Sequence, residues 1–167
     1  CALLAIMVYI WFRFEWQFSI AAILALAHDI LSTVGLFALT NFEFNLATVA
    51  AILTIAGYSI NDTVVVFDRV RENLRRYKSY EITDIITKSL NETLSRTVTT
   101  SVTTLLALGA IALFGGAVLR DFALAMIWGV FIGTYSSIFV AVGFLSRFDI
   151  RPQDPDDAGE APETERP

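Results

Sequence analysis

Charged residues are scarce in this chain, and cysteine and histidine are nearly absent. Lys, Arg, Asp and Glu make up 17% of the 167 residues, whereas average globular chains carry about 25%. The single Cys1 excludes a disulfide within the chain and any cysteine-based metal site. The single His28, beside Asp29, provides too few ligands for a metal centre. We find no nucleotide-binding loop or nucleophile elbow either, and therefore expect neither a cofactor nor an enzymatic activity.

Long apolar runs dominate the remainder of the sequence. Hydrophobic residues make up 55% of the chain, and residues 97–119 and 122–146 contain no charged residue or histidine. A helix needs roughly 20 apolar residues to cross a hydrocarbon core of about 30 Å. The sequence therefore predicts an all-α fold, a polytopic membrane helix bundle. Its complete spans are expected at residues 17–40, 44–67, 97–114 and 122–145.

The two ends of the chain differ from this pattern. Residues 1–12 are apolar, but as a helix they extend only about 18 Å at 1.5 Å per residue. We interpret them as the end of a truncated first span, which brings the bundle, residues 1–147, to about five transmembrane helices. This interpretation makes the chain a fragment or a processed product. Residues 148–167 are rich in proline and acidic residues and predict a disordered tail, which contributes much of the net charge of −5.

Basic residues are concentrated in one connection, residues 68–96. It holds seven of the twelve Lys and Arg residues, namely Arg69, Arg71, Arg75, Arg76, Lys78, Lys88 and Arg96. By the positive-inside rule this connection is cytoplasmic, as is the C-terminal tail. The short connections 41–43 and 115–121 then lie outside. Within the basic connection, residues 81–95 place their isoleucines and leucines on one stripe and predict a cytoplasmic amphipathic helix.

Asp62 is the clearest charged intrusion into an apolar span. Neighbouring polar residues, Ser59, Asn61 and Thr63, point in several directions around the same helix, so this span is expected inside a bundle. A charged group within a span is costly and needs a structural or functional reason. Two interpretations stay open: a structural carboxylate paired with a neighbouring helix, or a titratable proton carrier that is loaded and unloaded from water.

Three further polar residues accompany Asp62. Arg96 opens the next span at a similar depth, either as the partner that holds Asp62 ionised or as a snorkelling arginine at the boundary. His28 and Asp29 lie in the middle of the span at residues 17–40. Successive helix residues point about 100° apart, so we expect no contact between these two. Two roles for His28 and Asp29 remain open: a secondary proton path that also includes Asn61, or hydrogen bonding between helices.

Small residues recur every fourth position along the last predicted span. Gly129, Gly133 and Ser137 form a ridge on which another helix can approach closely, and we predict helix packing there.

Five motifs occur in the order of a known family. The run at residues 57–73, GYSINDTVVVFDRVREN, closely resembles the signature of the SecF subunit family of the SecD–SecF protein-export complex. The further matching motifs are AHD at 27–29, NETLSRT at 91–97, LFGG at 113–116 and GVFIGTYSS at 129–137. The resemblance covers roughly the whole predicted bundle. It implies the second to sixth spans of the family, without its first span and its outside domain.

The resemblance also implies a function. SecF-family proteins are RND-type membrane proteins of the bacterial cytoplasmic membrane, and the proton-motive force drives them, with the proton as the coupling ion. The implied partners are SecD, the SecY-containing translocon, exported preproteins and membrane lipid, and no nucleic acid. Asp62 and Arg96 match the proton-pathway positions of the family. His28 and Asp29 match a recurring pair to which the resemblance assigns no role.

Two rival functions remain as alternatives. The chain could be a passive membrane scaffold that packs through its small-residue ridge without transporting protons. An intramembrane aspartyl protease would use Asp29 and Asp62, but it needs two aspartates that converge on one water, and the usual Gly-x-Gly-Asp context is missing here.

Overall fold

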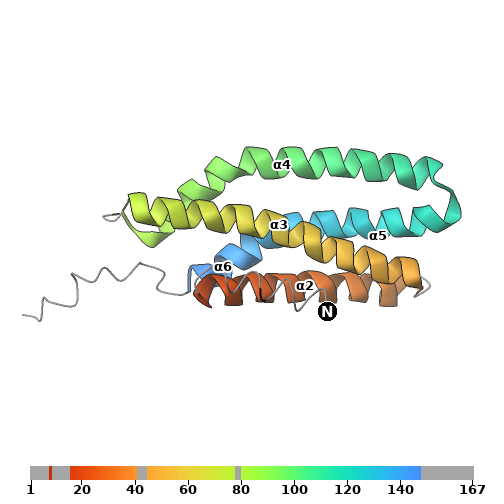
Figure 1. The fold of residues 1–167 in the computed structure, drawn as a ribbon, viewed down its shortest axis with the longest axis horizontal. Helices are drawn as coiled ribbons and strands as arrows, with labels where there is room; N and C mark the ends of the chain where they lie inside the picture. Colours follow the sequence, from red (N-terminus) through yellow and green to blue (C-terminus); the bar gives the residue numbers. More distant parts are fainter. Residues whose placement is uncertain (1–7, 9–15, 41–44, 78–79, 148–167) are drawn as a thin grey trace, which may run out of the picture.

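The computed structural model describes residues 8, 16–40, 45–77 and 80–147, and all secondary structure in these parts is helical (Figure 1). The elements are α2 (Trp16–Thr40), α3 (Leu46–Arg76), α4 (Ile82–Phe114), α5 (Gly116–Tyr135), the π-helical segment η1 (Ser136–Ala141) and α6 (Val142–Leu145). Four helical stretches are long and apolar enough to cross a membrane: Trp16–Thr40, Leu46–Arg76, Ile82–Phe114 and Leu119–Leu145. This confirms the all-α fold and four predicted spans. The truncated first span, apart from Val8, and the tail after residue 147 lie outside the described residues.

The helices form a bundle in which α3 occupies a central place. Figure 1 shows α2 on one side of α3 and α4 on the other, with α5 alongside α3 and α4. The chain leaves α5 through η1, which packs against α2 and α3. Each long helix therefore contacts α3, and side chains of α3 can meet groups from every other span.

Two of the helices are longer than the predicted spans. α3 continues to Arg76 and α4 already begins at Ile82, so the predicted amphipathic helix is the first part of α4 and not a separate element. No glycine or proline interrupts residues 82–108, and Ile85 and Ile86 are buried against the extension of α3. A 31-residue helix is about 46 Å long, whereas a hydrocarbon core is about 30 Å thick. The paired extensions of α3 and α4 therefore project beyond the apolar spans.

The connection between α4 and α5 is shorter than predicted. α4 ends at Phe114 and α5 begins at Gly116, so Arg120 and Asp121 lie on a helix and not in a hairpin. Gly116 has φ +77°, a conformation that side chains with a Cβ adopt reluctantly. Gly115 and Gly116 therefore allow the chain to reverse direction between α4 and α5 with almost no loop.

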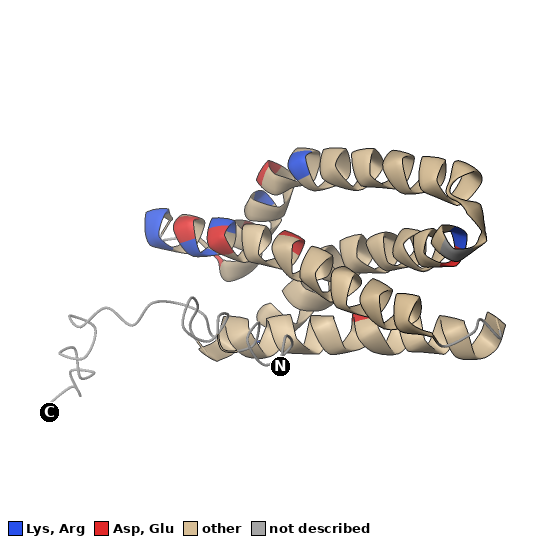
Figure 2. Ribbon diagram, turned by 45° about the vertical axis from the view of Figure 1, so that its right-hand side comes forward, with Lys and Arg blue, Asp and Glu red and all other residues tan. Residues whose placement is uncertain are grey.

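Charged side chains gather at one end of the bundle. Figure 2 shows Lys, Arg, Asp and Glu clustered where α3 ends and α4 begins, and a smaller group at the start of α5. We call the first region, formed by residues 68–77 and 81–96, the charged end. The connection at residues 41–44 lies outside the described residues.

Two hydrophobic clusters form the core. The cluster nearer the charged end includes Phe18 of α2 and Phe67 of α3, whose rings meet edge to face with centroids 5.4 Å apart, and Leu145 of α6. The cluster at the opposite end includes Phe37 of α2 and Val130 of α5. Buried polar side chains from all four spans accompany these clusters in the middle part of the bundle, and we call them the polar layer, the candidate functional site.

Candidate functional site in a buried polar layer

The polar layer contains nine buried polar or charged residues. They are Asp29 and Thr33 on α2, Ser59, Asp62 and Thr63 on α3, Thr97 and Ser101 on α4, and Ser136 and Ser137 on η1. Buried polar groups in an apolar medium are stable only when they are hydrogen-bonded or can change their protonation state. The bonding of the two aspartates therefore decides what the layer can do.

Asp29 is fully buried, with 0% exposure, and is held by groups from three elements. Its Oδ2 accepts hydrogen bonds from Ser59 Oγ on α3 and from Ser136 Oγ on η1, the second at 2.7 Å. Its Oδ1 lies 3.0 Å from His28 Nδ1, so the expectation that these neighbours do not meet was wrong. Periodicity gives the directions of the two Cβ atoms, whereas side-chain torsions bring the imidazole back over the carboxylate. Asp29 is thus a junction of α2, α3 and η1.

The π-helical segment supplies one of these hydrogen bonds. η1 interrupts an otherwise α-helical span and buries Ser136 and Ser137 within the bundle. Single π-helical turns inside α-helices occur frequently at functional sites. One turn before it, Gly133 lies against α3, where an added Cβ would be 3.2 Å from the Cβ of Ser59. This close approach brings η1 within reach of Asp29.

Asp62 is bonded quite differently. It is 4% exposed, and its buried Oδ2 has no hydrogen-bond partner among the described residues. Tyr58 of α3 donates to Ser101 of α4 at 3.4 Å. Asp62 lies one turn after Tyr58 on α3, and Thr97 lies one turn before Ser101 on α4. Because the two helices are antiparallel, Asp62 and Thr97 lie at the same level of the bundle. Thr97 Oγ1 is also buried without a partner in the described part of the chain.

Arg96 interacts with Asp62 electrostatically but does not bind it. Both residues are described, and no hydrogen bond or ion pair joins them. Arg96 is exposed at the edge of an open pocket that also includes Glu92 and Asp68. Asn61, a predicted member of the secondary path, is exposed, and its side chain makes no hydrogen bond with another described residue. The layer therefore combines a tightly bonded carboxylate, Asp29, with Asp62, whose carboxylate has no hydrogen-bond partner among the described residues.

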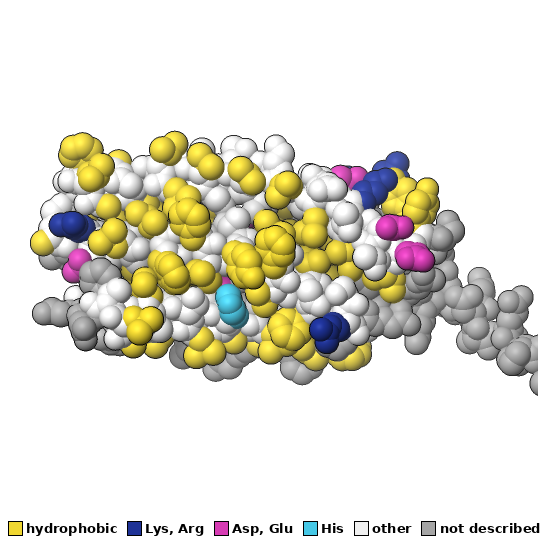
Figure 3. All heavy atoms as spheres, turned by 180° about the vertical axis from the view of Figure 1, so that it is seen from behind, with side chains coloured by type: hydrophobic (Ala, Val, Ile, Leu, Met, Phe, Trp, Pro, Cys, Tyr) yellow, Lys and Arg dark blue, Asp and Glu magenta, His cyan; other side chains and the backbone are white. Residues whose placement is uncertain are grey.

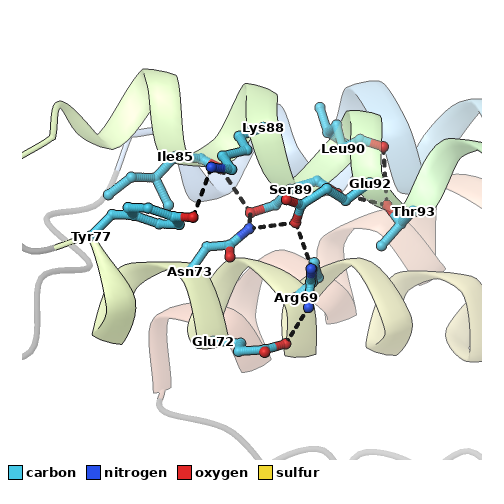
Figure 4. A network of polar contacts seen from close by, with 10 residues as sticks. All are labelled: Arg69, Glu72, Asn73, Tyr77, Ile85, Lys88, Ser89, Leu90, Glu92 and Thr93. Atoms are coloured by element: carbon cyan, nitrogen blue, oxygen red, sulfur yellow. Dashed lines mark hydrogen bonds and ion pairs between the residues drawn. The ribbon is translucent and has the colours of Figure 1, made fainter.

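A hydrogen-bonded network clamps the charged end next to this layer (Figure 4). Glu92 of α4 reaches between two residues of α3, accepting from Arg69 Nε at 2.6 Å and from Asn73 Nδ2 at 2.9 Å. Asn73 also donates to Ser89 at 2.9 Å, and Arg69 donates to Glu72 at 2.6 Å. Ion pairing across the two helix extensions fixes their register and hence the position of Arg96 one turn beyond Glu92.

The network also changes the protonation behaviour of Glu92, which lies beyond the apolar spans. Hydrogen bonds from Asn73 and Arg69 lower the pKa of Glu92 from its ordinary value of 4.5. A lowered pKa in the folded state means that Glu92 contributes stability above its ordinary pKa. That contribution is lost as the pH falls through the lowered value.

Replacing Asn73 tests the clamp. Asn73→Ala removes two hydrogen bonds from a residue that is buried between the helices and leaves Ser89 without its donor. We expect the free energy of unfolding to fall by about 1–3 kcal/mol in a denaturation experiment on the full-length protein in detergent. The control is Asn91→Ala, an exposed asparagine on α4, which should be neutral. Equal effects of the two substitutions would contradict the clamp.

The predicted small-residue ridge faces the inside of this chain. A Cβ at Gly129 would overlap the side chain of Ile55 on α3, and Gly133 lies against Ser59 of the same helix. Ser137 is fully buried. These three residues of the ridge are therefore occupied by packing within the chain.

Sequence reasoning identified both aspartates but not the serines that bind one of them. Ser59 and Ser136 lie 30 and 107 residues from Asp29, and no local pattern indicates such a contact. The serine pair at residues 136–137 in the middle of an apolar span was the available signal.

Known proteins resemble this chain over most of its length. Residues 1–151 match the family model described as protein export membrane protein SecD/SecF, C-terminal. The protein translocase subunit SecF of Rhodobacter capsulatus is 62% identical over 140 residues, which cover 84% of this chain and 42% of that protein. SecF of Rickettsia rickettsii is 54% identical over 145 residues, covering 87% and 47%.

Solved structures agree with these relatives. The crystal structure of SecDF from Thermus thermophilus, described as a translocon-associated membrane protein, matches with a TM-score of 0.84 at 50% identity. The match covers 87% of this chain and 20% of that one. A second SecDF structure, in a super-membrane-facing form, matches with a TM-score of 0.81. The chain spans less than half the length of the curated relatives.

Proposed function

Because the chain belongs to the SecD/SecF family of protein-export membrane proteins, we propose that it is part of a SecF-type subunit that couples the proton-motive force to protein export. The proposed partners are SecD, a SecY-containing translocon and the exported preproteins. The proposed orientation places the charged end and the C-terminus on the cytoplasmic side, following the positive-inside rule. The bundle supplies the membrane part of this activity.

The observation that supports proton coupling is the bonding of Asp62. A carboxylate that only stabilises a fold is normally held by donors, as Asp29 is. Asp62 is buried in an apolar span, and its Oδ2 accepts no hydrogen bond from the described residues. It can therefore gain or lose a proton without breaking a hydrogen bond that joins two helices.

Arg96 gives the proton transfer a counter-charge. When Arg96 approaches, its guanidinium stabilises the ionised carboxylate of Asp62, and when it withdraws, the carboxylate takes up a proton. The arginine is exposed and its guanidinium makes no hydrogen bond or ion pair with the described residues, so the side chain can make this movement. Alternation between the two arrangements would load Asp62 from one side of the membrane and unload it to the other.

A charge-removing substitution at Arg96 tests this role. Arg96→Gln in the full-length protein should reduce proton-driven export in membrane vesicles several-fold, because Asp62 loses its counter-charge. Arg96→Lys should retain a larger share of the activity. Arg120→Gln, which removes an exposed arginine at the far end of the bundle, is the matched control. Export that is unchanged in Arg96→Gln would remove Arg96 from the mechanism.

A further inference from the structure

Three arginines near the end of α3 belong neither to the clamp at the charged end nor to the polar layer. We propose that Arg71, Arg75 and Arg76 form a binding site for the phosphate of an anionic phospholipid headgroup. The site is independent of whether Asp62 carries a proton. Three observations support it: an open hollow that the arginines line, the charge balance inside the hollow, and its level relative to the apolar spans.

The hollow lies along the last turns of α3 and has a volume of about 470 Å³. Figure 2 shows basic and acidic side chains crowded on these turns. The described residues that line the hollow are all charged, namely Asp68, Arg71, Glu72, Arg75 and Arg76. Because one water occupies about 30 Å³ in the liquid, the hollow has room for a phosphate group.

The charge balance of the lining favours an anion. Three positive side chains face two negative ones in the hollow. One of the negative side chains, Glu72, is already paired with Arg69, which donates to it at 2.6 Å. An excess of positive charge in a concave surface attracts a negatively charged ligand.

Two of the arginines have donors available for such a ligand. Arg75 and Arg76 are exposed, and their guanidinium groups form no hydrogen bond or ion pair with the described residues. The guanidinium of Arg76 lies 5.6 Å from the centroid of the Tyr77 ring, a cation–π contact that does not use its N–H donors. A guanidinium can bind two phosphate oxygens at once through its planar fork of N–H groups.

A contact between α2 and α3 places the membrane boundary next to the hollow. The ring of Phe18 on α2 meets Phe67, the last residue of the apolar run of α3. Trp16, two residues before Phe18, is 58% exposed, and tryptophan is enriched where lipid headgroups begin. At 1.5 Å per residue, Arg71 and Arg75 lie about 6 Å and about 12 Å beyond Phe67 along α3.

These levels match the headgroup layer of a bilayer. That layer extends about 5–8 Å beyond the hydrocarbon core on each side, so Arg71 lies within it. Arg75 and Arg76 begin slightly further out, and long arginine side chains can bend back toward the interface. Figure 3 shows hydrophobic side chains on the back of the bundle reaching up to the charged residues at its end. A lipid can therefore place its acyl chains beside the apolar spans and its phosphate in the hollow.

Native mass spectrometry of the full-length protein tests the site. The protein in detergent is titrated with phosphatidylglycerol, and the bound lipid is counted at each concentration. Arg75→Gln should weaken binding roughly five-fold, the usual contribution of one basic residue near an anionic lipid surface. The double variant Arg75→Gln/Arg76→Gln should lose more, whereas Arg75→Lys should keep most of the binding. Arg120→Gln, at an exposed arginine on the opposite end of the bundle, is the matched control and should bind like the wild type.

Further arms of the experiment identify the ligand. Phosphatidylcholine with the same acyl chains carries no net charge and should bind more weakly than phosphatidylglycerol. Equal binding of phosphatidylglycerol by the wild type and the double variant would overturn the proposal. Displacement of the lipid by inorganic phosphate at equal concentration would also overturn it, in favour of a site for free phosphate. Lipid binding that occurs only after deletion of residues 148–167 would instead assign the arginines to the acidic tail.

Discussion

Asp62→Asn is expected to abolish the proposed proton-driven export in membrane vesicles while leaving insertion of the full-length protein and its binding to the proposed partner SecD intact. Asparagine has nearly the shape of aspartate but cannot exchange a proton under these conditions. No hydrogen bond to Asp62 Oδ2 is lost, because none joins it to the described residues. Export is measured with a proton gradient imposed across the vesicle membrane, and binding by co-purification with SecD.

The control for this prediction is a carboxylate outside the polar layer. Asp84→Asn removes an exposed aspartate from α4 and should leave export unchanged. A passive scaffold gives a different pattern, in which Asp62→Asn is silent. Normal proton-dependent export by Asp62→Asn would therefore reject the carrier and favour the scaffold.

Gly129→Ala is expected to destabilise the bundle by about 1–3 kcal/mol, the usual range for overpacking a close-packed core. The added Cβ overlaps the side chain of Ile55, which is 1% exposed and, being β-branched, has little rotational freedom. This loss is expected even though alanine is intrinsically better than glycine in a helix interior. Thermal unfolding of the full-length protein in detergent measures the change.

A paired substitution and a control glycine isolate the cause. Ile55→Ala removes the overlapping atoms, so the double variant should be more stable than the sum of the two single effects predicts. The control is Gly109→Ala on α4. A Cβ added at Gly109 has no neighbouring atom within 4 Å, so this substitution should be neutral or stabilising. Additive effects at positions 55 and 129 would show that α3 and α5 do not approach as closely as described.

The spans and the charged intrusions were predictable because each depends on local composition. Crossing hydrocarbon requires a long apolar run, so the four spans could be predicted from long apolar stretches with few or no charged residues. A charged side chain within such a run costs free energy and needs a structural or functional reason. Asp62 and Asp29 could therefore be identified as candidate site residues from the sequence. Neither inference required knowledge of which helices are neighbours.

The contacts within the polar layer were not predictable, because they depend on packing between distant segments. The two serines that bind Asp29 come from other helices, and a close approach at Gly133 brings one of them within reach. The pairing of His28 with Asp29 depends on side-chain torsions, which a helical periodicity does not specify.

Proton flux across liposomes that contain the full-length protein shows whether Asp62 carries protons. A pH-sensitive dye trapped inside reports the flux after a pH step, without any need for an export substrate. We predict a protein-dependent flux in the wild type and in Asp84→Asn, and its loss in Asp62→Asn. A flux of wild-type size in Asp62→Asn would contradict the assignment of Asp62 as the proton carrier.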